Sequence, residues 1–126
     1  MLKKGFKQLL AEANATIETV AAPSAVGLLG EDDVVFVDVR EAHEREQGFI
    51  PGSVHAPRGF LEFIADPEGP MHNPALSPGK LLVLYCGSGS RSALAAKTLR
   101  DMGFPRVGSL IGGVAAWQEA GGPLSG

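Results

Sequence analysis

Short runs of apolar residues recur along the chain, and polar turns separate them. The clearest runs are residues 34–39 and 81–85, which are too short for a helix and apolar throughout except for Asp38. Continuous apolar runs of this length are typical of strands that are buried on both faces of a sheet. Five runs are predicted to be strands: residues 16–20, 34–39, 53–56, 81–85 and 107–111.

Segments with helical spacing of apolar residues lie between these strands. The first carries Leu2, Phe6 and Leu9 on one side and lysines on the other, which predicts an amphipathic N-terminal helix. Because strands and helices alternate, we expect an α/β fold with a central, mostly parallel five-stranded sheet, helices on both faces and right-handed crossovers. Helices are predicted at residues 2–13, 23–29, 41–47, 60–65, 90–102 and 114–120.

The chain has no internal repeat and no sign of a second domain. We expect an N-terminal amphipathic helix as an extension over residues 1–15, followed by one α/β domain over residues 16–126. Prolines and glycines break regular structure throughout residues 66–80, which predicts a long ordered loop. His72 lies in this loop, and the sequence leaves its role open.

Composition and charge limit the classes of function. The 126 residues include 11 Lys or Arg and 14 Asp or Glu, a net charge of −3, so no basic excess is available for nucleic acid or an anionic membrane. The apolar runs are far too short to span a bilayer, and polar residues interrupt the N-terminal segment where a signal peptide needs an apolar stretch. We therefore expect a cytoplasmic protein with neither nucleic acid nor membrane as a partner.

The single cysteine, Cys86, lies at the edge of the predicted sheet where α/β folds bind their ligands. It follows the predicted strand 81–85 and precedes the predicted helix 90–102, at the carboxyl edge of the sheet. The start of that helix and the glycines before it aim main-chain N–H groups at this point, and Arg91 adds a cation. Such surroundings lower the pKa of a thiol, so we expect Cys86 to be an accessible nucleophile at neutral pH.

A different interpretation treats Cys86 as a small apolar residue at the end of a core strand, the usual role of a lone cysteine. The residues that follow it argue against this, because glycine, serine and arginine supply hydrogen-bond donors and a charge at positions where a packed core would contain apolar side chains. The nucleophile is therefore the favoured interpretation. The loop residues predicted to bind its anion are Gly87, Ser88, Gly89, Ser90 and Ser92.

Three separate motifs in this sequence resemble those of single-domain rhodaneses, and the resemblance covers nearly all of residues 16–126. Phe49 departs from the pattern, because many relatives carry histidine there, but we expect catalysis to survive the change. The first motif runs from Val37 to Arg40 and continues through Glu44, Gly48, Ile50, Pro51, Gly52 and Ser53; the second is residues 86–92; the third comprises Gly112, Gly113, Trp117, Gly121 and Pro123.

This resemblance implies a rhodanese-like fold in which the cysteine takes a sulfane sulfur from a donor such as thiosulfate, holds it as a persulfide, and passes it to cyanide or a thiol, without a cofactor. Four residues separate Cys86 from Arg91, the spacing that resembles sulfurtransferases, whereas related phosphatases have five. An alternative is a sulfur-relay module that binds a protein acceptor through its N-terminal helix. A phosphatase is the least favoured alternative.

Other residues are candidates for supporting roles. Asp38 and Arg40 are expected to form a buried structural pair that fixes the loop. Arg58 is a candidate contact for an anionic substrate, with a solvated surface arginine as the alternative. Trp117 is expected to anchor the core.

No metal site is expected. The segment from His43 to Gln47 resembles the zinc motif HExxH but lacks its second histidine. A single cysteine can form neither a disulfide within the chain nor a thiolate metal cage.

Overall fold

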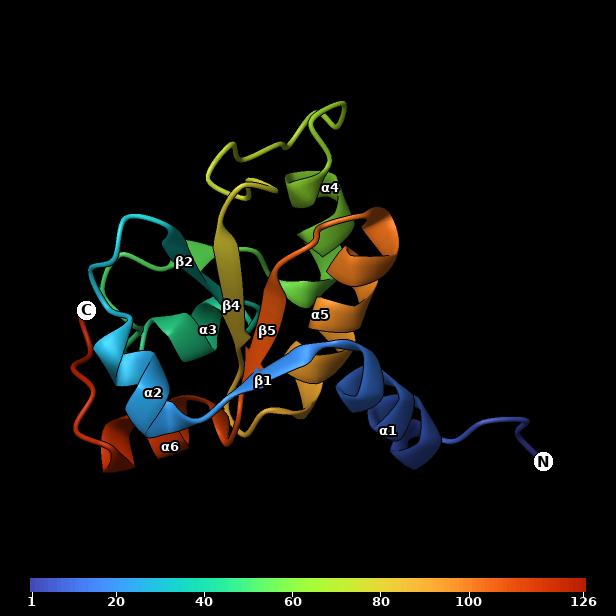
Figure 1. Ribbon diagram of the computed structural model, residues 1–126, viewed down its shortest axis with the longest axis horizontal. Helices are drawn as coiled ribbons and strands as arrows, with labels where there is room; N and C mark the ends of the chain where they lie inside the picture. Colours follow the sequence, from blue (N-terminus) through green and yellow to red (C-terminus); the bar gives the residue numbers. More distant parts are fainter.

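A five-stranded sheet in the order β1-β5-β4-β2-β3, with every strand pair parallel, forms the centre of the protein (Figure 1). The structure is a computed structural model that describes residues 1–126. The sheet confirms the predicted α/β fold. Its strands are β1 (Glu18–Val20), β2 (Val34–Asp38), β3 (Val54–His55), β4 (Leu81–Tyr85) and β5 (Val107–Leu110).

Helices cover both faces of this sheet. The helices are α1 (Phe6–Thr16), α2 (Ala22–Gly27), α3 (Ala42–Arg45), α4 (Leu61–Ala65), α5 (Ser90–Met102) and α6 (Gly113–Glu119), with a 3-10 turn, η1 (Arg58–Phe60), before α4. One face packs against α2 and α6 and the other against α4 and α5, and α1 packs against α5 (Figure 1). None of these helices combines the length and the apolar character needed to cross a membrane.

Strand β4 illustrates why its sequence is continuously apolar. Leu82 and Leu84 point into the core cluster under α4 and α5, while Val83 and Tyr85 point into the cluster under α2 and α6. Because successive side chains of a strand point to opposite faces, a strand between two helical layers needs apolar residues at every position. Cys86 follows directly and belongs to the cluster under α4 and α5.

The N-terminal helix differs from its prediction. It begins at Phe6 rather than Leu2 and ends at Thr16 rather than Ala13. Phe6 is 67% exposed and Leu9 is 42% exposed, and only Ala13 is buried. The amphipathic spacing therefore predicted the helix correctly, and most of its apolar side chains stay exposed because α1 packs mainly against one neighbouring helix, α5.

The loop of residues 66–80 contains neither helix nor strand, and main-chain hydrogen bonds hold it. Asn73 N donates to the carbonyl oxygen of Ile64 at 2.9 Å, and His72 Nδ1 lies 3.2 Å from the same oxygen. Because this loop leads into β4, it lies at the amino edge of the parallel sheet, opposite the edge at which Cys86 follows that strand. His72 is therefore not part of the site around Cys86.

Trp117→Ala should destabilise the protein by about 3–5 kcal/mol, because a fully buried aromatic side chain leaves a cavity. Trp117 is 0% exposed, and its ring packs edge-on against that of Phe36, with the ring centroids 5.4 Å apart. Its Nε1 donates a hydrogen bond to the Pro123 carbonyl oxygen at 2.8 Å. Urea unfolding measures the change. Phe63→Ala is the matched control, since Phe63 is 52% exposed, and we expect a change within about 0.5 kcal/mol. Similar losses in both variants would contradict this core assignment.

Candidate active site

The loop after β4 folds back over the sulfur of Cys86. Gly89 has a φ of 109°, a left-handed conformation that side chains other than glycine rarely adopt, and it turns the chain into α5. The main-chain N–H groups of Gly89 and Ser92 donate to Cys86 Sγ, with N···S distances of 3.1 Å and 3.4 Å. The predicted convergence of loop amides on the sulfur is thus present in the structure.

Helix α6 holds this loop from outside. Val114 N donates to the carbonyl oxygen of Cys86 at 2.9 Å, and Ala115 N donates to that of Gly87 at 3.4 Å. A Cβ atom on Gly113 would collide with the backbone of Cys86 and Gly87, so only glycine permits this close approach. The first turn of α6 therefore fixes the position of the two residues that begin the loop.

The Cys86 side chain is enclosed. The residue is only 1% exposed, so the expectation of an accessible thiol differs from the structure: the side chain points into the cluster under α4 and α5, and the loop covers it. Burial raises the pKa of the Cys86 thiol, but hydrogen bonds from the Ser92 hydroxyl and from the N–H groups of Ser92, Gly89 and Ser88 outweigh burial and lower that pKa. Enclosure agrees with a core cysteine, whereas this concentration of donors around sulfur is what a thiolate needs.

Two buried serines extend the hydrogen bonding away from the sulfur. The Cys86 thiol donates to the Ser92 hydroxyl oxygen at 3.6 Å, and the hydroxyls of Ser92 and Ser109 lie 2.8 Å apart. Ser92 is 0% exposed and Ser109 is 3% exposed. Ser109 comes from β5, so sequence spacing gave no indication of this contact.

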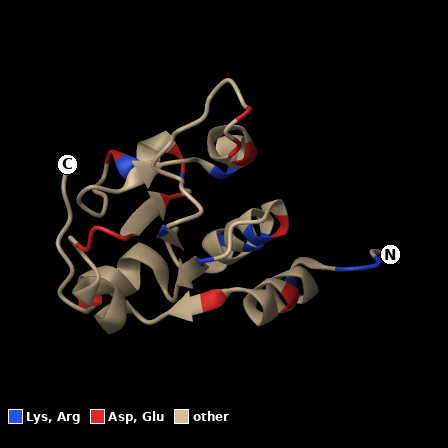
Figure 2. Ribbon diagram, turned by 45° about the horizontal axis from the view of Figure 1, so that its top comes forward, with Lys and Arg blue, Asp and Glu red and all other residues tan.

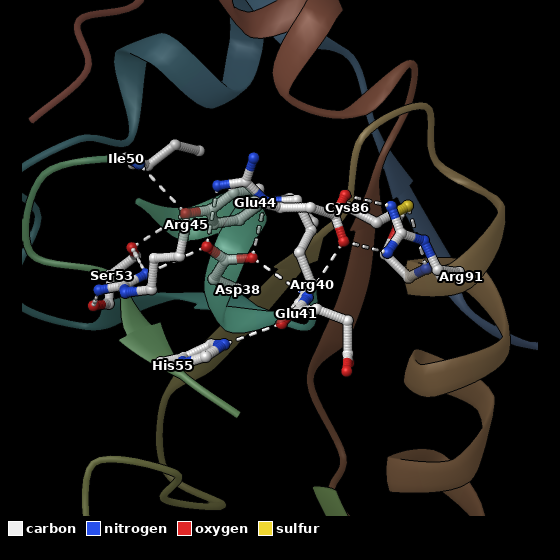
Figure 3. Close-up of polar contacts among 12 residues, drawn as sticks. Asp38, Arg40, Glu41, Glu44, Arg45, Ile50, Ser53, His55, Cys86 and Arg91 are labelled. Carbon is white, nitrogen blue, oxygen red and sulfur yellow. Dashed lines mark hydrogen bonds and ion pairs between the residues drawn. The ribbon is translucent and has the colours of Figure 1, made fainter. Parts of the chain in front are cut away.

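Arg91 lies beside the loop but forms its ion pair with Glu44 of α3. The guanidinium donates to both carboxylate oxygens, at 2.7 Å and 2.8 Å (Figure 3). These bonds from Arg91 lower the pKa of Glu44 to about 2, and the Glu44 carboxylate raises the pKa of Arg91. The cation predicted to serve the loop is therefore paired with the carboxylate of a residue 47 positions away.

The predicted pair of Asp38 and Arg40 is present and buried. Arg40 Nε donates to Asp38 Oδ1 at 2.9 Å, and Arg40 Nη2 donates to Asp38 Oδ2 at 3.0 Å and to the Gly48 carbonyl at 2.8 Å (Figure 3). Burial raises the pKa of Asp38, but the hydrogen bonds and charge of Arg40 outweigh it, so the pKa is lowered. The bond to Gly48 ties the turn after α3 to the end of β2, in agreement with the expected structural role.

Sequence reasoning missed the rest of this buried network. Arg45 Nη1 donates to Asp38 Oδ2 at 3.1 Å and to the Ser53 hydroxyl at 3.0 Å. The hydroxyls of Ser53 and Tyr85 are 3.0 Å apart, and Ile50 N donates to the Tyr85 hydroxyl at 3.1 Å. The sequence identified Glu44 only as a motif residue. Its spacing from Glu41 fits the capping box that begins α3, but this spacing gave no indication of the contact with Arg91.

The remaining candidates are dispersed. Ser88 and Ser90 are exposed at the rim of the loop. Arg58 donates to Glu62 at 3.2 Å and to the Thr98 hydroxyl at 3.1 Å, so its guanidinium contacts α4 and α5 rather than the loop. No group of three or more His, Cys, Asp or Glu side chains has the arrangement of a metal site.

The chain belongs to the rhodanese-like domain family, whose sequence pattern matches residues 22–120. This match confirms the resemblance carried by the three motifs. It leaves α1 and β1 outside the family's matched region, although β1 pairs with β5 in the same sheet.

Two relatives have names that refer to sulfur transfer or sulfur carriage, and one similar solved structure has a different description. A sulfurtransferase from Allochromatium vinosum is 33% identical over 97 residues, which cover 77% of this chain and 83% of that protein. A Bacillus subtilis protein whose name proposes a sulfur carrier is 29% identical, and the chain spans only 58% of its length. A solved structure from Rhodopseudomonas palustris, described as a protein of unknown function and possible tyrosine phosphatase, is 46% identical, with a TM-score of 0.93 over 99% of this chain and 97% of that one.

The alkylation of Cys86 by iodoacetamide should have a pH midpoint below that of a free cysteine, because hydrogen bonds stabilise the thiolate. Ser92→Ala should raise the midpoint, since it removes the hydroxyl that accepts from the thiol and can donate to the thiolate once the proton has left. Ser90→Ala is the matched control, because Ser90 is exposed at the rim, and it should leave the midpoint unchanged. The midpoint is taken from alkylation rates measured across a pH series. Enclosure of the thiol lowers all of these rates together and therefore does not shift the midpoint. A wild-type midpoint at or above that of free cysteine would contradict the thiolate site.

Glu44→Gln should reduce the loss of folding stability that occurs as the pH falls into the acidic range. The folded pKa of Glu44 is lowered to about 2. Its ion pair therefore contributes stability above the unfolded pKa of about 4.3, and that contribution is lost as pH falls toward the folded value. We expect the ion pair to contribute about 1 kcal/mol or less to the free energy of unfolding, because solvent screens this partly exposed pair.

Urea unfolding of wild type and variant from neutral pH to the acid limit measures this effect. Arg91→Gln should weaken the same pH dependence, and the double variant should add little, because both residues belong to one pair. Identical pH dependence in all four proteins would show that the pair contributes nothing to folding.

Proposed function

We propose that this protein is a sulfurtransferase in which Cys86 carries a sulfane sulfur as a persulfide, with thiosulfate as a donor and a thiol or cyanide as acceptor. The observation that carries the proposal is the Cys86 sulfur, bonded by the N–H groups of Gly89 and Ser92 at the start of α5. Membership of the rhodanese-like family and the naming of a relative as a sulfurtransferase support the same class.

The proposed chemistry has two steps that share one sulfur atom. In the first, the Cys86 thiolate attacks the outer sulfur of thiosulfate, the S–S bond of thiosulfate breaks, and sulfite leaves with the bonding electrons. In the second, the acceptor attacks the outer sulfur of the persulfide, and the electrons of that S–S bond return to Cys86. The donors around Cys86 Sγ stabilise the anion that begins the first step and ends the second.

The phosphatase alternative comes from the description of the Rhodopseudomonas palustris protein. Two features of this chain favour the sulfurtransferase instead. Four residues, rather than five, separate Cys86 from Arg91, which leaves fewer main-chain donors for the oxygens of a phosphate. Arg91 also has both of its outer nitrogens bonded to Glu44, so a phosphate dianion would have to share the guanidinium with that carboxylate.

A sulfur relay to a protein acceptor remains the alternative of the same chemical class. The observation that favours it is the exposed apolar side chains on and before α1: Leu2 is 80% exposed and Phe6 is 67% exposed. Its first step would be the same loading of Cys86, so both alternatives depend on the experiment that follows.

Incubation with thiosulfate, and in parallel with inorganic polysulfide, should add the mass of one sulfur atom to the intact protein. Mass spectrometry should locate that atom on Cys86, cyanide should remove it as thiocyanate, and Cys86→Ser should gain nothing. Hydrolysis of p-nitrophenyl phosphate should be undetectable in both proteins. Loss of loading from both donors, or Cys86-dependent hydrolysis of the phosphate ester, would contradict the proposal.

A further inference from the structure

Ser109 interrupts an otherwise apolar face of the sheet. Strand β5 places it in register with Leu84 of β4, whose side chain points into the cluster under α4 and α5. Val107, two positions before Ser109, belongs to the same cluster, so the side chain of Ser109 points to that face as well. Ser109 is 3% exposed, and burying a hydroxyl among apolar side chains is unfavourable unless the hydroxyl is hydrogen-bonded.

The partners of this hydroxyl belong to the loop that encloses the sulfur. A Cβ atom on Gly89 would lie 3.4 Å from the carbonyl oxygen of Leu110, so the loop rests against the end of β5. There the Ser109 hydroxyl lies 2.8 Å from the Ser92 hydroxyl and 3.5 Å from the Gly89 carbonyl oxygen. The Ser92 hydroxyl lies 3.1 Å from the same carbonyl oxygen and 3.6 Å from Cys86 Sγ. Ser92 therefore links Ser109 to the sulfur.

The Ser92 hydroxyl has a single proton and more than one acceptor within reach. While Cys86 is a thiol, its S–H donates to the Ser92 oxygen, and the Ser92 proton is directed away from the sulfur, at the Gly89 carbonyl oxygen. Once Cys86 has lost its proton, the thiolate only accepts, so the Ser92 hydroxyl must turn its proton toward the sulfur. The Ser109 hydroxyl can then donate to the Ser92 oxygen, which keeps both hydroxyls hydrogen-bonded.

Ser109 favours the orientation of Ser92 that serves the anion. A proton donated by Ser109 to the Ser92 oxygen holds that oxygen beside the sulfur and polarises the Ser92 O–H bond, which strengthens its bond to the thiolate. With alanine at position 109, the Gly89 carbonyl is the only partner of the Ser92 hydroxyl besides the sulfur, a local bond to the start of α5 that competes for its single proton.

We propose that Ser109 is a positioning residue for sulfur transfer, and that its bond to the Ser92 hydroxyl directs a hydrogen bond at Cys86 whenever the sulfur is an anion. The inference rests on the proposed function, in which this anion begins the loading step and is restored by the transfer step. Both serine hydroxyls rotate and keep their protons, so the thiol proton is the only one released. No hydrogen bond joins Ser109 to the sulfur itself, so Ser109 acts through Ser92.

The charged groups around the sulfur stay the same in every variant of the test below. Residues 81–90 and 107–118, which contain β4, the loop, β5 and most of α6, include no Lys, Arg, Asp or Glu (Figure 2). A shift in the titration of Cys86 therefore reports the hydroxyls. The charged side chains of the other elements around the site bond to partners of their own: Asp38 to Arg40 and Arg45, Glu44 to Arg91, Glu62 to Arg58, Lys97 to Asp101, and Arg100 to the Pro105 carbonyl.

Ser109→Ala should raise the pH midpoint of Cys86 alkylation by iodoacetamide by about 0.5 unit, part of the effect of one hydrogen bond to a charged group. The acid side of the pH profile for sulfur loading from thiosulfate should shift equally, so loading there slows about threefold. Alanine is close to serine in size, so the fold should persist. Ser53→Ala is the matched control, because it also removes a buried hydroxyl, but one bonded to Arg45 and Tyr85 rather than to the loop. It should keep the wild-type midpoint.

A double variant tests whether Ser109 acts through Ser92. Ser92→Ala combined with Ser109→Ala should have the same midpoint as Ser92→Ala alone, because the second change then removes nothing that reaches the sulfur. An unchanged midpoint in Ser109→Ala, a further shift in the double variant, or an equal shift in Ser53→Ala overturns the positioning role alone. The alkylation needs no sulfur donor. Absence of sulfur on wild-type Cys86 after loading, with these midpoints as expected, would overturn the proposed function and leave the link from Ser109 to the thiolate intact.

Discussion

Hydrogen bonds from the main chain to one enclosed sulfur atom organise the carboxyl edge of this sheet. Gly89 and Ser92 can direct their N–H groups at Cys86 Sγ only because the loop turns sharply between β4 and α5. That turn is held in place by α6, whose first residues bond to the carbonyl groups of Cys86 and Gly87. Gly113 makes the contact sterically possible, so residues near the end of the chain determine the geometry around its central strand.

A second set of interactions connects the core to the charged rim of the loop. Asp38 is fully buried and binds two arginines, Arg40 and Arg45, one before α3 and one at its end. A buried carboxylate is stable in such a position only when its charge and its oxygens have partners. Helix α3 is thereby held where Glu44 reaches Arg91. The network thus positions the carboxylate that pairs with the arginine of the loop.

Local patterns were sufficient for most of the fold. Both termini of the strand at Leu81–Tyr85 and of the helix at Ser90–Met102 agree with the prediction, because the first is a continuous apolar run and the second has helical spacing, and both have clear boundaries. The N-terminal helix was predicted with the wrong boundaries, and the spacing of its apolar residues did not tell how much of it a neighbouring helix covers. Residues 16–126 contain the whole sheet, yet Leu10 and Asn14 of α1 line a groove together with Ser88 and Ser90 of the loop.

The sequence by itself determined which residues follow one another around Cys86, and so it determined the loop, its helix and the pairing of Asp38 with Arg40 two positions later. Only the tertiary structure decided that the sulfur is enclosed, that Arg91 is paired with Glu44, and that Arg58 contacts other helices. The physical reason is distance along the chain. Neighbouring residues meet through local backbone geometry, whereas residues tens of positions apart meet only through the packing of whole elements, which no short pattern encodes.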